Sequence, residues 1–483
     1  MGTPTTLSSL LGEISKRLQS PRALSEVFVL DVSSADLASL QNDLLDNKYD
    51  IPGQVASRKY FAGKWPAFAE FVVAYVTFVR DLDPYYIETS YPLLERLVSE
   101  LQNAFSRPQG AVLCDIVRVI TSFMLPLAIE LDGMYGRGGG ASGNGEEMTT
   151  AMPRTMEMSK TLLRFFNTVR AERPTATVED LASMKKGVLL HIAALLCRSY
   201  FTLNQPYTCA TVISNMATLN MRFSAYPRSQ RVTFRYYLGR YYLLRQELLR
   251  ARKHLYWAFK NCHGEATHNM RAILTYLVPV NILLGIGTRG LGRYAHGALY
   301  DTVSGGEDSS LAGAELQMMY EPLERALRVG DMYAYNAHLT KHMSWFLRKR
   351  LFVVLRSRGV VILMRNLFRR IALEHVRHGA GGRGAGDLSY EELLVGVRLS
   401  TRLRGSSEQR ARVLPIGSEE DAWTGAEVEN LCVSLIDQGL VKANIYARNQ
   451  IVRLMPSGGF PAIHEAWAAR GDMWEREEAW LER

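Results

Sequence analysis

The sequence predicts an all-α protein, built as a solenoid of stacked helices that ends in a small module with a β-hairpin. Up to His378, apolar residues recur at three- and four-residue intervals, the spacing of a helix with one buried face. Polar links between these segments are short, so consecutive helices are expected to stack as antiparallel neighbours. From Val360 onward the pattern becomes three helices followed by two short stretches that predict strands.

The array is expected to consist of helices separated by glycine-rich or polar loops. The expected helices are Leu7–Leu18, Ala35–Leu45, Trp65–Arg80, Ile87–Phe105, Val112–Met134, Met152–Val169, Val178–Thr202, Tyr207–Met221, Arg231–Leu244, Leu248–Cys262, Asn269–Leu284, Met319–Ala326 and Met332–Leu355. Gly136–Gly145, Gly379–Gly386 and Gly405–Ser418 predict loops. Gly285 predicts the C-cap of a helix. The residues from Gly285 match the glycine spacing of a dinucleotide-binding motif, but they follow an expected helix and not a strand, so a cofactor site is not expected there.

One pair of expected helices carries a repeat signature. From Arg235 the chain reads R-x-x-L-G-x-x-Y, and from Ala251 it reads A-x-x-x-L-x-x-A, the spacing of a tetratricopeptide helix pair. Small residues at Gly239 and Ala251 would let the two helices approach closely, while Tyr242 and Leu255 would fill the crossing. Arg235 stands where such repeats usually have Trp, so the unit is degenerate, but it favours a solenoid.

The last helices and strands follow the order of a winged helix. The expected helices are Val360–Val376, Tyr390–Leu399 and Ala426–Gln438, the last closed by Gly439. Two strands, Leu440–Tyr446 and Gln450–Met455, are joined by Ala447, Arg448 and Asn449. Three helices followed by a hairpin is the arrangement of that small fold.

Composition limits the kind of partner. The chain has 483 residues, 47% of them hydrophobic, which excludes global disorder, and a net charge of +9 with a pI near 9.2. Such an excess fits nucleic acid, an anionic membrane or an acidic protein.

The five cysteines are scattered, which predicts free thiols in a reducing compartment. No signal peptide begins the sequence, and the apolar runs Trp65–Val79 and Ile273–Gly287 are too short to span a bilayer, so we expect a soluble intracellular protein.

Between Lys341 and Ala372 there are nine Lys and Arg residues and no Asp or Glu. Apolar residues at helical spacing run through the same stretch, so it is expected to be folded and not a solvated tail. A folded surface with one sign of charge indicates a polyanionic partner.

A degenerate repeat array that runs into a winged helix resembles a PCI domain, the module of subunits of the proteasome lid, the signalosome and translation initiation factor three. The stretches Gln230–Gly239, Ala258–Cys262, Asn269–Leu284, Arg365–Ile371 and Gly439–Tyr446 are similar to one branch. That branch contains the PCI subunit of the TREX-two messenger-export complex and the signalosome-subunit-twelve-like family. The resemblance covers roughly residues 178 to 463. It divides the chain into an N-terminal helical region (1–175), a helical-repeat part (176–358), a winged helix (359–456) and a helical C-terminal tail (457–483).

The resemblance implies a non-catalytic scaffold subunit that couples transcription to messenger export in the nucleus, with the nuclear pore and the cytoplasm left open as further locations. It implies three partners: a larger PCI-type scaffold subunit, a small acidic peptide subunit of the DSS-one/Sem-one class, and RNA or DNA bound without sequence preference. No membrane partner, metal or cofactor is expected. The alternatives are the signalosome-twelve-like role in transcription elongation and splicing, or a purely structural lid-type subunit.

Two groups of cations are the candidate contacts. The expected nucleic-acid contacts are Arg369, Arg370, Arg398, Arg402, Arg404, Lys442, Arg448 and Arg453. Guanidinium groups pair bidentately with phosphate oxygens, and such binding weakens steeply with salt. The third helix carries Glu427, Glu429 and Asp437, which is poor for major-groove reading, so backbone contact by the wing and the first helix is expected. The alternative is a solvated basic face.

The second group is expected to receive the acidic peptide subunit through charge complementarity. Its members are Arg348, Lys349, Arg350, Arg356 and Arg358. The alternative is ion pairing within the chain.

Other constellations favour structural roles. Tyr236, Tyr237, Tyr241 and Tyr242 lie at helical spacing and are expected to be core residues rather than base-stacking platforms. The histidines near Cys262 lack metal-ligand spacing, and we find no catalytic triad, carboxylate pair or phosphate-binding loop.

Overall fold

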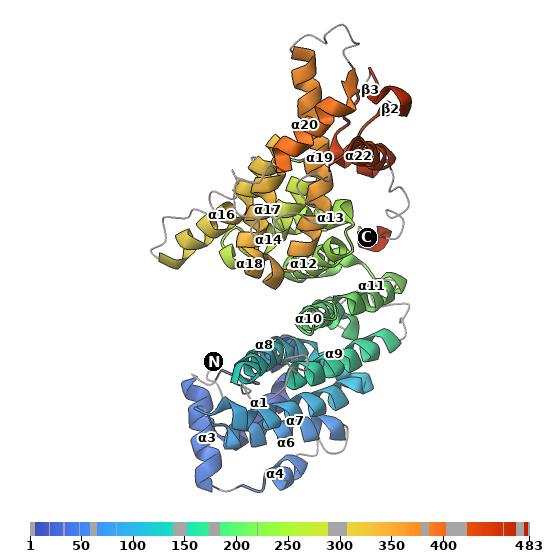
Figure 1. The fold of residues 1–483 in the computed structure, drawn as a ribbon. Coiled ribbons are helices and arrows are strands. Elements are labelled where there is room, and N and C mark those ends of the chain that lie inside the picture. Colours follow the sequence, from blue (N-terminus) through green and yellow to red (C-terminus); the bar gives the residue numbers. More distant parts are fainter. Residues whose placement is uncertain are drawn as a thin grey trace. The chain divides into compact units, whose positions relative to one another are not determined.

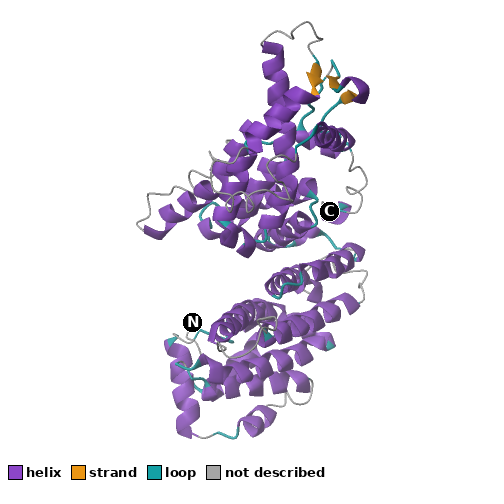
Figure 2. Cartoon of the chain, in the orientation of Figure 1, coloured by secondary structure: helices purple, strands orange, loops and turns teal. Residues whose placement is uncertain are grey.

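The structure is a computed structural model, and it describes the chain except residues 1–4, 19, 32–33, 48, 58–64, 84, 139–151, 173–183, 220, 288–306, 378–385, 402–422, 457, 470–477 and 482–483. Helices dominate the described residues, and the strands form one small sheet near the C-terminus (Figure 2). The chain forms two compact units: unit 1 contains Met1–Tyr237 with Glu478–Arg483, and unit 2 contains Leu238–Glu477. The predicted fold class is confirmed.

Unit 1 is a stack of helices that follow one another along the chain (Figure 1). Its α-helices are α1 (Leu7–Arg17), α2 (Pro21–Ser25), α3 (Ala35–Asn47), α4 (Ile51–Ser57), α6 (Pro66–Asp81), α7 (Ile87–Ser106), α8 (Cys114–Gly138), α9 (Pro153–Ala171), α10 (Leu189–Thr202), α11 (Cys209–Thr218) and the first part of α12 (Arg228–Leu244). Short 3-10 turns include η1 (Pro108–Leu113), η3 (Lys185–Val188) and η5 (Phe223–Ala225). Among the described residues of unit 1, the sequence missed the helices α2 and α4, which are too short to show a helical period. The helix expected over Val178–Thr202 begins only at Leu189, after the turn η3.

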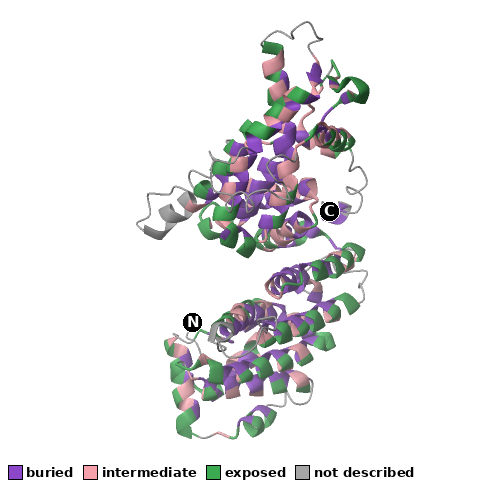
Figure 3. Cartoon of the chain, viewed as in Figure 1, coloured by how far each residue is buried: buried purple, intermediate pink, exposed green. Residues whose placement is uncertain are grey.

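Side chains from neighbouring helices fill the interior of unit 1, where buried residues line the helix faces that meet (Figure 3). The ring of Phe28 packs edge-on against Tyr75 at 4.9 Å and lies 5.1 Å from Phe71. Asp132, buried near the end of α8, accepts hydrogen bonds of 2.8 Å from the Thr155 amide and hydroxyl, so it caps the first turn of α9.

Residues Pro108–Met134 are long and apolar enough to cross a membrane by length and composition alone. Half of the residues in their most apolar window are buried.

The segment Glu478–Leu481 belongs to unit 1, although the chain reaches it only after unit 2. Trp480 is 7% exposed and packs edge-on against Phe223 and Phe234, with ring centroids 6.2 and 6.0 Å away. The Arg235 guanidinium, itself buried, donates a 2.9 Å hydrogen bond to the Leu481 carbonyl. Arg235, which stands at the Trp position of the repeat signature, thus holds a distant segment of the chain.

Unit 2 begins with the repeat pair and continues into the winged helix. Its elements are the rest of α12, α13 (Leu248–Asn261), α14 (Thr267–Leu283), α16 (Glu307–Val329), α17 (Met332–Lys341), α18 (Met343–Arg348), α19 (Phe352–Arg377), β1 (Asp387–Ser389), α20 (Tyr390–Thr401), α22 (Gly425–Asp437), β2 (Ala443–Tyr446), η6 (Ala447–Asn449), β3 (Ile451–Leu454) and α23 (Ile463–Ala468). The predicted close approach of α12 and α13 is present. A Cβ atom on Gly239 would lie 2.6 Å from Leu255 Cγ, and Tyr242 stacks on His254 at 5.5 Å.

The single helix expected over Met332–Leu355 is wrong: the chain forms α17, α18 and the start of α19 there. Arg350 ends α18 in the left-handed region, with φ at +58°. The Leu351 amide donates to the Phe346 carbonyl and the Arg350 amide to Leu347, both at 2.9 Å, which is a Schellman turn. The turn buries Leu351, and α19 then runs without interruption across residues 358–359, where we expected the winged helix to begin.

The winged helix has the expected order, with one strand that the sequence did not reveal. The sheet order is β1-β3-β2 and both pairs are antiparallel. Leu388 and Ile445 both face Val452 in the register. Gly439 ends α22 at φ +70°, as expected for its C-cap, and the Ala447–Asn449 link predicted between the two strands is the turn η6. β1 has only three residues and follows a glycine-rich stretch, so no alternating pattern marked it.

We expect Trp480→Ala to destabilise unit 1 by about 3 kcal/mol, since it empties a site between two aromatic rings. Local stability measured by hydrogen exchange of η5 and α12 would check this, because a two-unit chain need not unfold in one step. Tyr207→Ala is the control, since Tyr207 is 67% exposed in the same unit. Equal exchange in the two variants would contradict the role given to Trp480.

Candidate nucleic-acid interface

The three helices of the winged helix are joined by hydrogen bonds between side chains. His375 Nδ1 on α19 lies 3.1 Å from Glu392 Oε1 on α20, and Glu392 Oε2 accepts from the Ser389 amide at 2.8 Å, which caps α20. The Tyr390 hydroxyl donates to Glu429 on α22 at 2.9 Å. Burial and this bond to Glu429 raise the pKa of Tyr390 to about 12. These contacts fix α20 and α22 relative to α19.

The wing is a hairpin whose base is tied to the chain that follows it. The Lys442 amide donates to the Gly459 carbonyl at 2.8 Å, and the Met455 amide donates to the Lys442 carbonyl at 2.9 Å. At the tip, η6 places Arg448 between the two strands. Lys442 and Arg448 are both exposed, and neither forms an ion pair among the residues that the structure describes.

Arg453 on β3 lies between Asp387 and Tyr446, and its pairing with Asp387 means that it is not an unpaired cation. It donates from Nε and Nη2 to the two carboxylate oxygens of Asp387, at 2.7 and 2.9 Å. Its guanidinium also lies 5.2 Å from the ring centroid of Tyr446. The hydrogen bond with Asp387 raises the pKa of Arg453 above its ordinary value. Arg453 therefore ties β1 to β3, and its charge is offset by Asp387.

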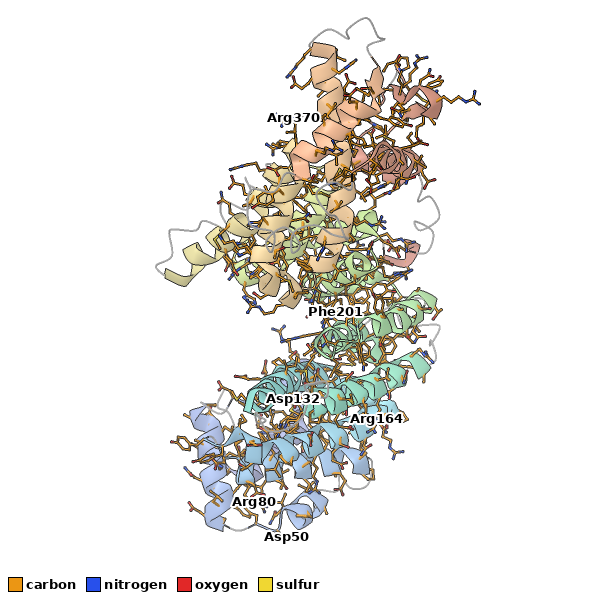
Figure 4. The ribbon with its side chains drawn as sticks, in the orientation of Figure 1. Asp50, Arg80, Asp132, Arg164, Phe201 and Arg370 are labelled. Carbon is orange, nitrogen blue, oxygen red and sulfur yellow. The ribbon has the colours of Figure 1, made fainter. Side chains whose placement is uncertain are left out.

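The remaining cations lie on α19 and α20. Arg369 and Arg370 are exposed on α19, and Arg370 Nη1 lies 3.5 Å from the Val329 carbonyl at the end of α16. Figure 4 shows Arg370 on the side of α19 away from the wing strands. Arg398 is exposed near the end of α20 and donates to the Trp423 carbonyl at 3.1 Å. Arg402 and Arg404 lie outside the described residues.

The third helix, α22, carries no Lys or Arg at all. Its exposed residues are Ala426, Asn430, Val433, Ser434 and Asp437. Glu427 caps the helix by accepting from the Thr424 amide at 2.6 Å, and Glu429 is used by Tyr390. A helix that enters a major groove runs between two rows of phosphates, so a helix without cations is a poor reader of bases. The described cations thus form two groups, one on the wing and one on α19 and α20.

The five cations of the expected partner site differ in how free they are. Arg348 and Lys349 are exposed. The Arg356 guanidinium lies 5.8 Å from the Phe352 ring centroid, and Arg358 Nε donates to Gln246 Oε1 at 2.7 Å. Arg350 adopts the left-handed turn that ends α18. Arg356 and Arg358 are thus held by contacts within unit 2, but the partners just given for them are not acids.

The structure adds two cations to this site that sequence reasoning missed. Partial desolvation of its otherwise exposed side chain lowers the pKa of Lys349, and the charges of Arg271, Arg240 and Arg348 lower it further, while Glu315 opposes them. Glu315 accepts a hydrogen bond from Arg271 and another, 2.6 Å long, from Trp345 Nε1. Arg240 and Arg271 precede the basic stretch Lys341–Ala372 by about 100 and 70 residues in the sequence, so no local pattern pointed to them.

We call this surface the cation cluster, and it consists of Lys349 with the three arginines whose charges act on it, Arg240, Arg271 and Arg348; Arg271 is paired with Glu315. Exposed apolar side chains lie on the same or the next helix: Met343 and Leu347 on α18 and Val353 on α19 are 43%, 44% and 64% exposed. Three exposed apolar groups beside cations suit a partner segment that alternates acidic and apolar residues.

Histidine and cysteine side chains are scattered among the described residues. Among the described residues, no group of three or more His, Cys, Asp or Glu side chains could hold a metal ion. Cys114, Cys197, Cys209 and Cys432 are buried free thiols, and burial raises the pKa of Cys432 to about 12. Of the four tyrosines expected in the core, Tyr241 and Tyr242 are buried, whereas Tyr236 and Tyr237 are partly exposed.

A helical array that ends in a winged helix, with β1-β3-β2 sheet order, is the architecture of a PCI-domain protein. No family model matches the chain, but individual relatives do. A PCI domain-containing protein of Schizosaccharomyces pombe is 29% identical over 480 residues, which cover 98% of this chain and 97% of the relative. The nuclear mRNA export protein THP1 of Saccharomyces cerevisiae is 23% identical over 389 residues, 78% of each chain. The protein CSN12 homolog of Neurospora crassa is 29% identical over 286 residues, 58% of this chain and 56% of the relative.

The chain is thus similar over nearly its whole length to a PCI domain-containing protein. It is also similar to both of the groups that the sequence suggested, the one that contains THP1 and the one that contains the CSN12 homologues.

We expect Asp387→Asn to raise the affinity of the chain for single-stranded RNA about threefold at low salt, the size of one exposed ion pair. The change removes the acid that offsets Arg453, so the wing gains one effective positive charge. Fluorescence anisotropy with a labelled oligonucleotide would measure it, and the gain should vanish at high salt. Glu321→Gln is the control, since Glu321 pairs with Arg325 on α16. An unchanged affinity in Asp387→Asn would argue against phosphate contact by the wing.

Proposed function

We propose that this protein is a non-catalytic subunit of a nuclear complex that couples transcription to messenger RNA export, and that it binds the backbone of RNA or DNA without sequence preference. The observation that carries the nucleic-acid part is the placement of charge in the winged helix. The helix that would read bases is free of cations, while Lys442 and Arg448 on the wing and Arg369 and Arg370 on α19 are exposed. Cations placed outside a helix that carries only acidic charges suit phosphates and not base edges.

The part of the proposal that concerns messenger export draws on relatives. A protein named for nuclear mRNA export aligns with 78% of the chain, and this supports a place in an export complex of the TREX-two type and a nuclear location. Such a subunit would bind a larger PCI-type scaffold. The cation cluster, with its neighbouring apolar side chains, is the surface we assign to a small acidic peptide subunit of the DSS-one/Sem-one class.

The second candidate is the CSN12-like role in transcription elongation and splicing. The observation that favours it is the match to CSN12 homologues of two fungi at 28–29% identity over 58% of this chain. The two candidates share the winged helix and the cation cluster, and they differ in the scaffold subunit. Purification of the tagged chain from its own cells, followed by mass spectrometry, separates them by the scaffold that is recovered. Recovery of proteasome-lid or signalosome subunits alone would contradict both.

We expect Arg369→Glu with Arg370→Glu, and separately Lys442→Glu with Arg448→Glu, each to weaken RNA binding at least tenfold. Each reversed phosphate contact loses attraction and adds repulsion. Anisotropy titrations at several salt concentrations would also show a smaller salt dependence, by about 0.7 in logarithmic slope for each lost contact on single strands. Arg325→Glu with Arg328→Glu, on α16, is a matched reversal of two exposed arginines outside the winged helix. Equal losses in the control would mean that net charge alone governs binding.

We expect Arg348→Glu with Lys349→Glu to slow association with the acidic peptide subunit by about tenfold and to remove most of its salt dependence. Charge complementarity acts chiefly on the association rate, and reversal places like charges opposite each other. Stopped-flow mixing or surface plasmon resonance with the purified peptide would measure the rate. The same variant should bind RNA as the unchanged chain does. Loss of RNA binding together with an unchanged peptide rate would reverse the assignment of the two surfaces.

A further inference from the structure

Arg365 belongs to the basic stretch by sequence, but its side chain lies inside the winged helix. It is 7% exposed on α19, and its guanidinium donates to the Pro461 carbonyl at 2.6 Å and the Phe460 carbonyl at 3.3 Å. A third bond, 2.8 Å long, goes to Asn366 Oδ1, and the ring centroid of Phe460 lies 5.6 Å away. Among the described residues it forms no ion pair.

A buried cation without a counter-charge is unfavourable, since desolvation of the charge is not offset by an acid. Burial, and the nearby charge of Arg369, lower the pKa of Arg365 to about 10, so the group remains cationic at neutral pH. An apolar residue at this place would avoid that cost, but it would leave two backbone carbonyls without donors. One planar guanidinium can serve both carbonyls and the neighbouring amide at once, which a lysine cannot do.

The carbonyls that Arg365 holds lie next to the base of the wing. The Gly459 carbonyl, one residue before Phe460, accepts from the Lys442 amide at 2.8 Å. The Lys442 carbonyl in turn accepts from the Met455 amide, which closes the hairpin below β2 and β3. A continuous path of hydrogen bonds and backbone thus runs from α19 through Arg365 and residues 459–461 to the start of the wing. On α19 itself, Asn366 is fixed by a 2.9 Å bond from Nδ2 to the Leu327 carbonyl.

We propose that Arg365 is a positioning residue for nucleic-acid binding: it holds the wing against α19, so that Lys442 and Arg448 on the wing keep a fixed spacing, along one phosphate backbone, from Arg369, which lies one turn after Arg365 on the same face of α19. This rests on the proposed function of the winged helix. Arg365 itself does not touch the nucleic acid, because its guanidinium is buried and both terminal nitrogens donate within the chain, Nη1 to Asn366 and Nη2 to the Phe460 and Pro461 carbonyls. Its effect on affinity comes from the order of the wing, since a mobile wing would lose conformational freedom each time it bound.

The test uses the full-length chain with Arg365→Met, Arg365→Lys and the control Arg377→Met. Arg377 lies on the same helix, and it is an exposed arginine paired with Glu374, so the control removes one cation from α19 without touching the wing. We expect Arg365→Met to speed hydrogen exchange of residues 441–455 at least tenfold while α14 and α16 stay unchanged. RNA affinity for a labelled oligouridine should fall about tenfold, with a smaller salt dependence. Arg365→Lys should recover part of both, and Arg377→Met should change neither by more than twofold.

The outcomes separate the two layers of the proposal. Unchanged exchange in the wing of Arg365→Met would overturn the positioning role. Faster exchange in the wing of Arg365→Met, together with an RNA affinity no lower than that of Arg377→Met, would show that Arg365 holds the wing but that an ordered wing does not improve binding. This outcome would also overturn the proposal. If the unchanged chain binds no RNA, the proposed function fails, and exchange alone decides whether Arg365 holds the wing. If Arg365→Met loses its helical circular dichroism signal, Phe460→Leu replaces it as the test variant. This change removes the ring that lies beside the Arg365 guanidinium and so weakens the same contact.

Discussion

The packing of α19 is the constraint on which unit 2 depends. This helix is at once the last member of the helical array and the first helix of the winged helix, and it packs against α14, α16 and α17 as well as α20 and α22. The fit is tight at Gly359, where any Cβ atom would collide with the hydroxyl of Tyr335, and that hydroxyl donates to the Leu355 carbonyl at 2.9 Å. No flexible link separates the array from the winged helix along this helix. Cations on α19 are therefore held by the cores on both sides.

Several arginines of this chain serve its own structure. Arg453 is offset by Asp387, Arg358 bonds to Gln246, and Arg365 and Arg235 hold backbone carbonyls inside the two units. Arginine suits such places because it remains charged and carries several donors in a fixed plane. What remains on the surface of the winged helix is a smaller set of cations, separated by a third helix with none. A charge count alone would overestimate the strength of phosphate binding, and it would miss the distribution that argues against base reading.

The helical array and the winged helix could be predicted because their signals are local. Helical periodicity, the Gly239–Leu255 approach and the Gly439 cap each depend on residues a few positions apart, and each is present. The break at Arg350 was missed because a left-handed turn without glycine has no sequence mark. The state of individual cations could not be predicted either. Whether Arg453 or Arg365 is free depends on Asp387 and on the Pro461 carbonyl, and these partners are 66 and 96 residues away. The roles of the surface cations stay predictions.

The return of the chain to unit 1 has a consequence for synthesis. Arg235 and the Leu481 carbonyl that it binds are 246 residues apart, and all of unit 2 lies between them. At ribosomal rates of about 5 to 20 residues per second, roughly 12 to 50 s pass between the emergence of α12 and that of Trp480. During that interval Phe223 and Phe234 lack the ring that covers them in the finished protein. The nascent chain thus presents an aromatic surface to chaperones, and its N-terminal half reaches full stability only when translation has passed the winged helix.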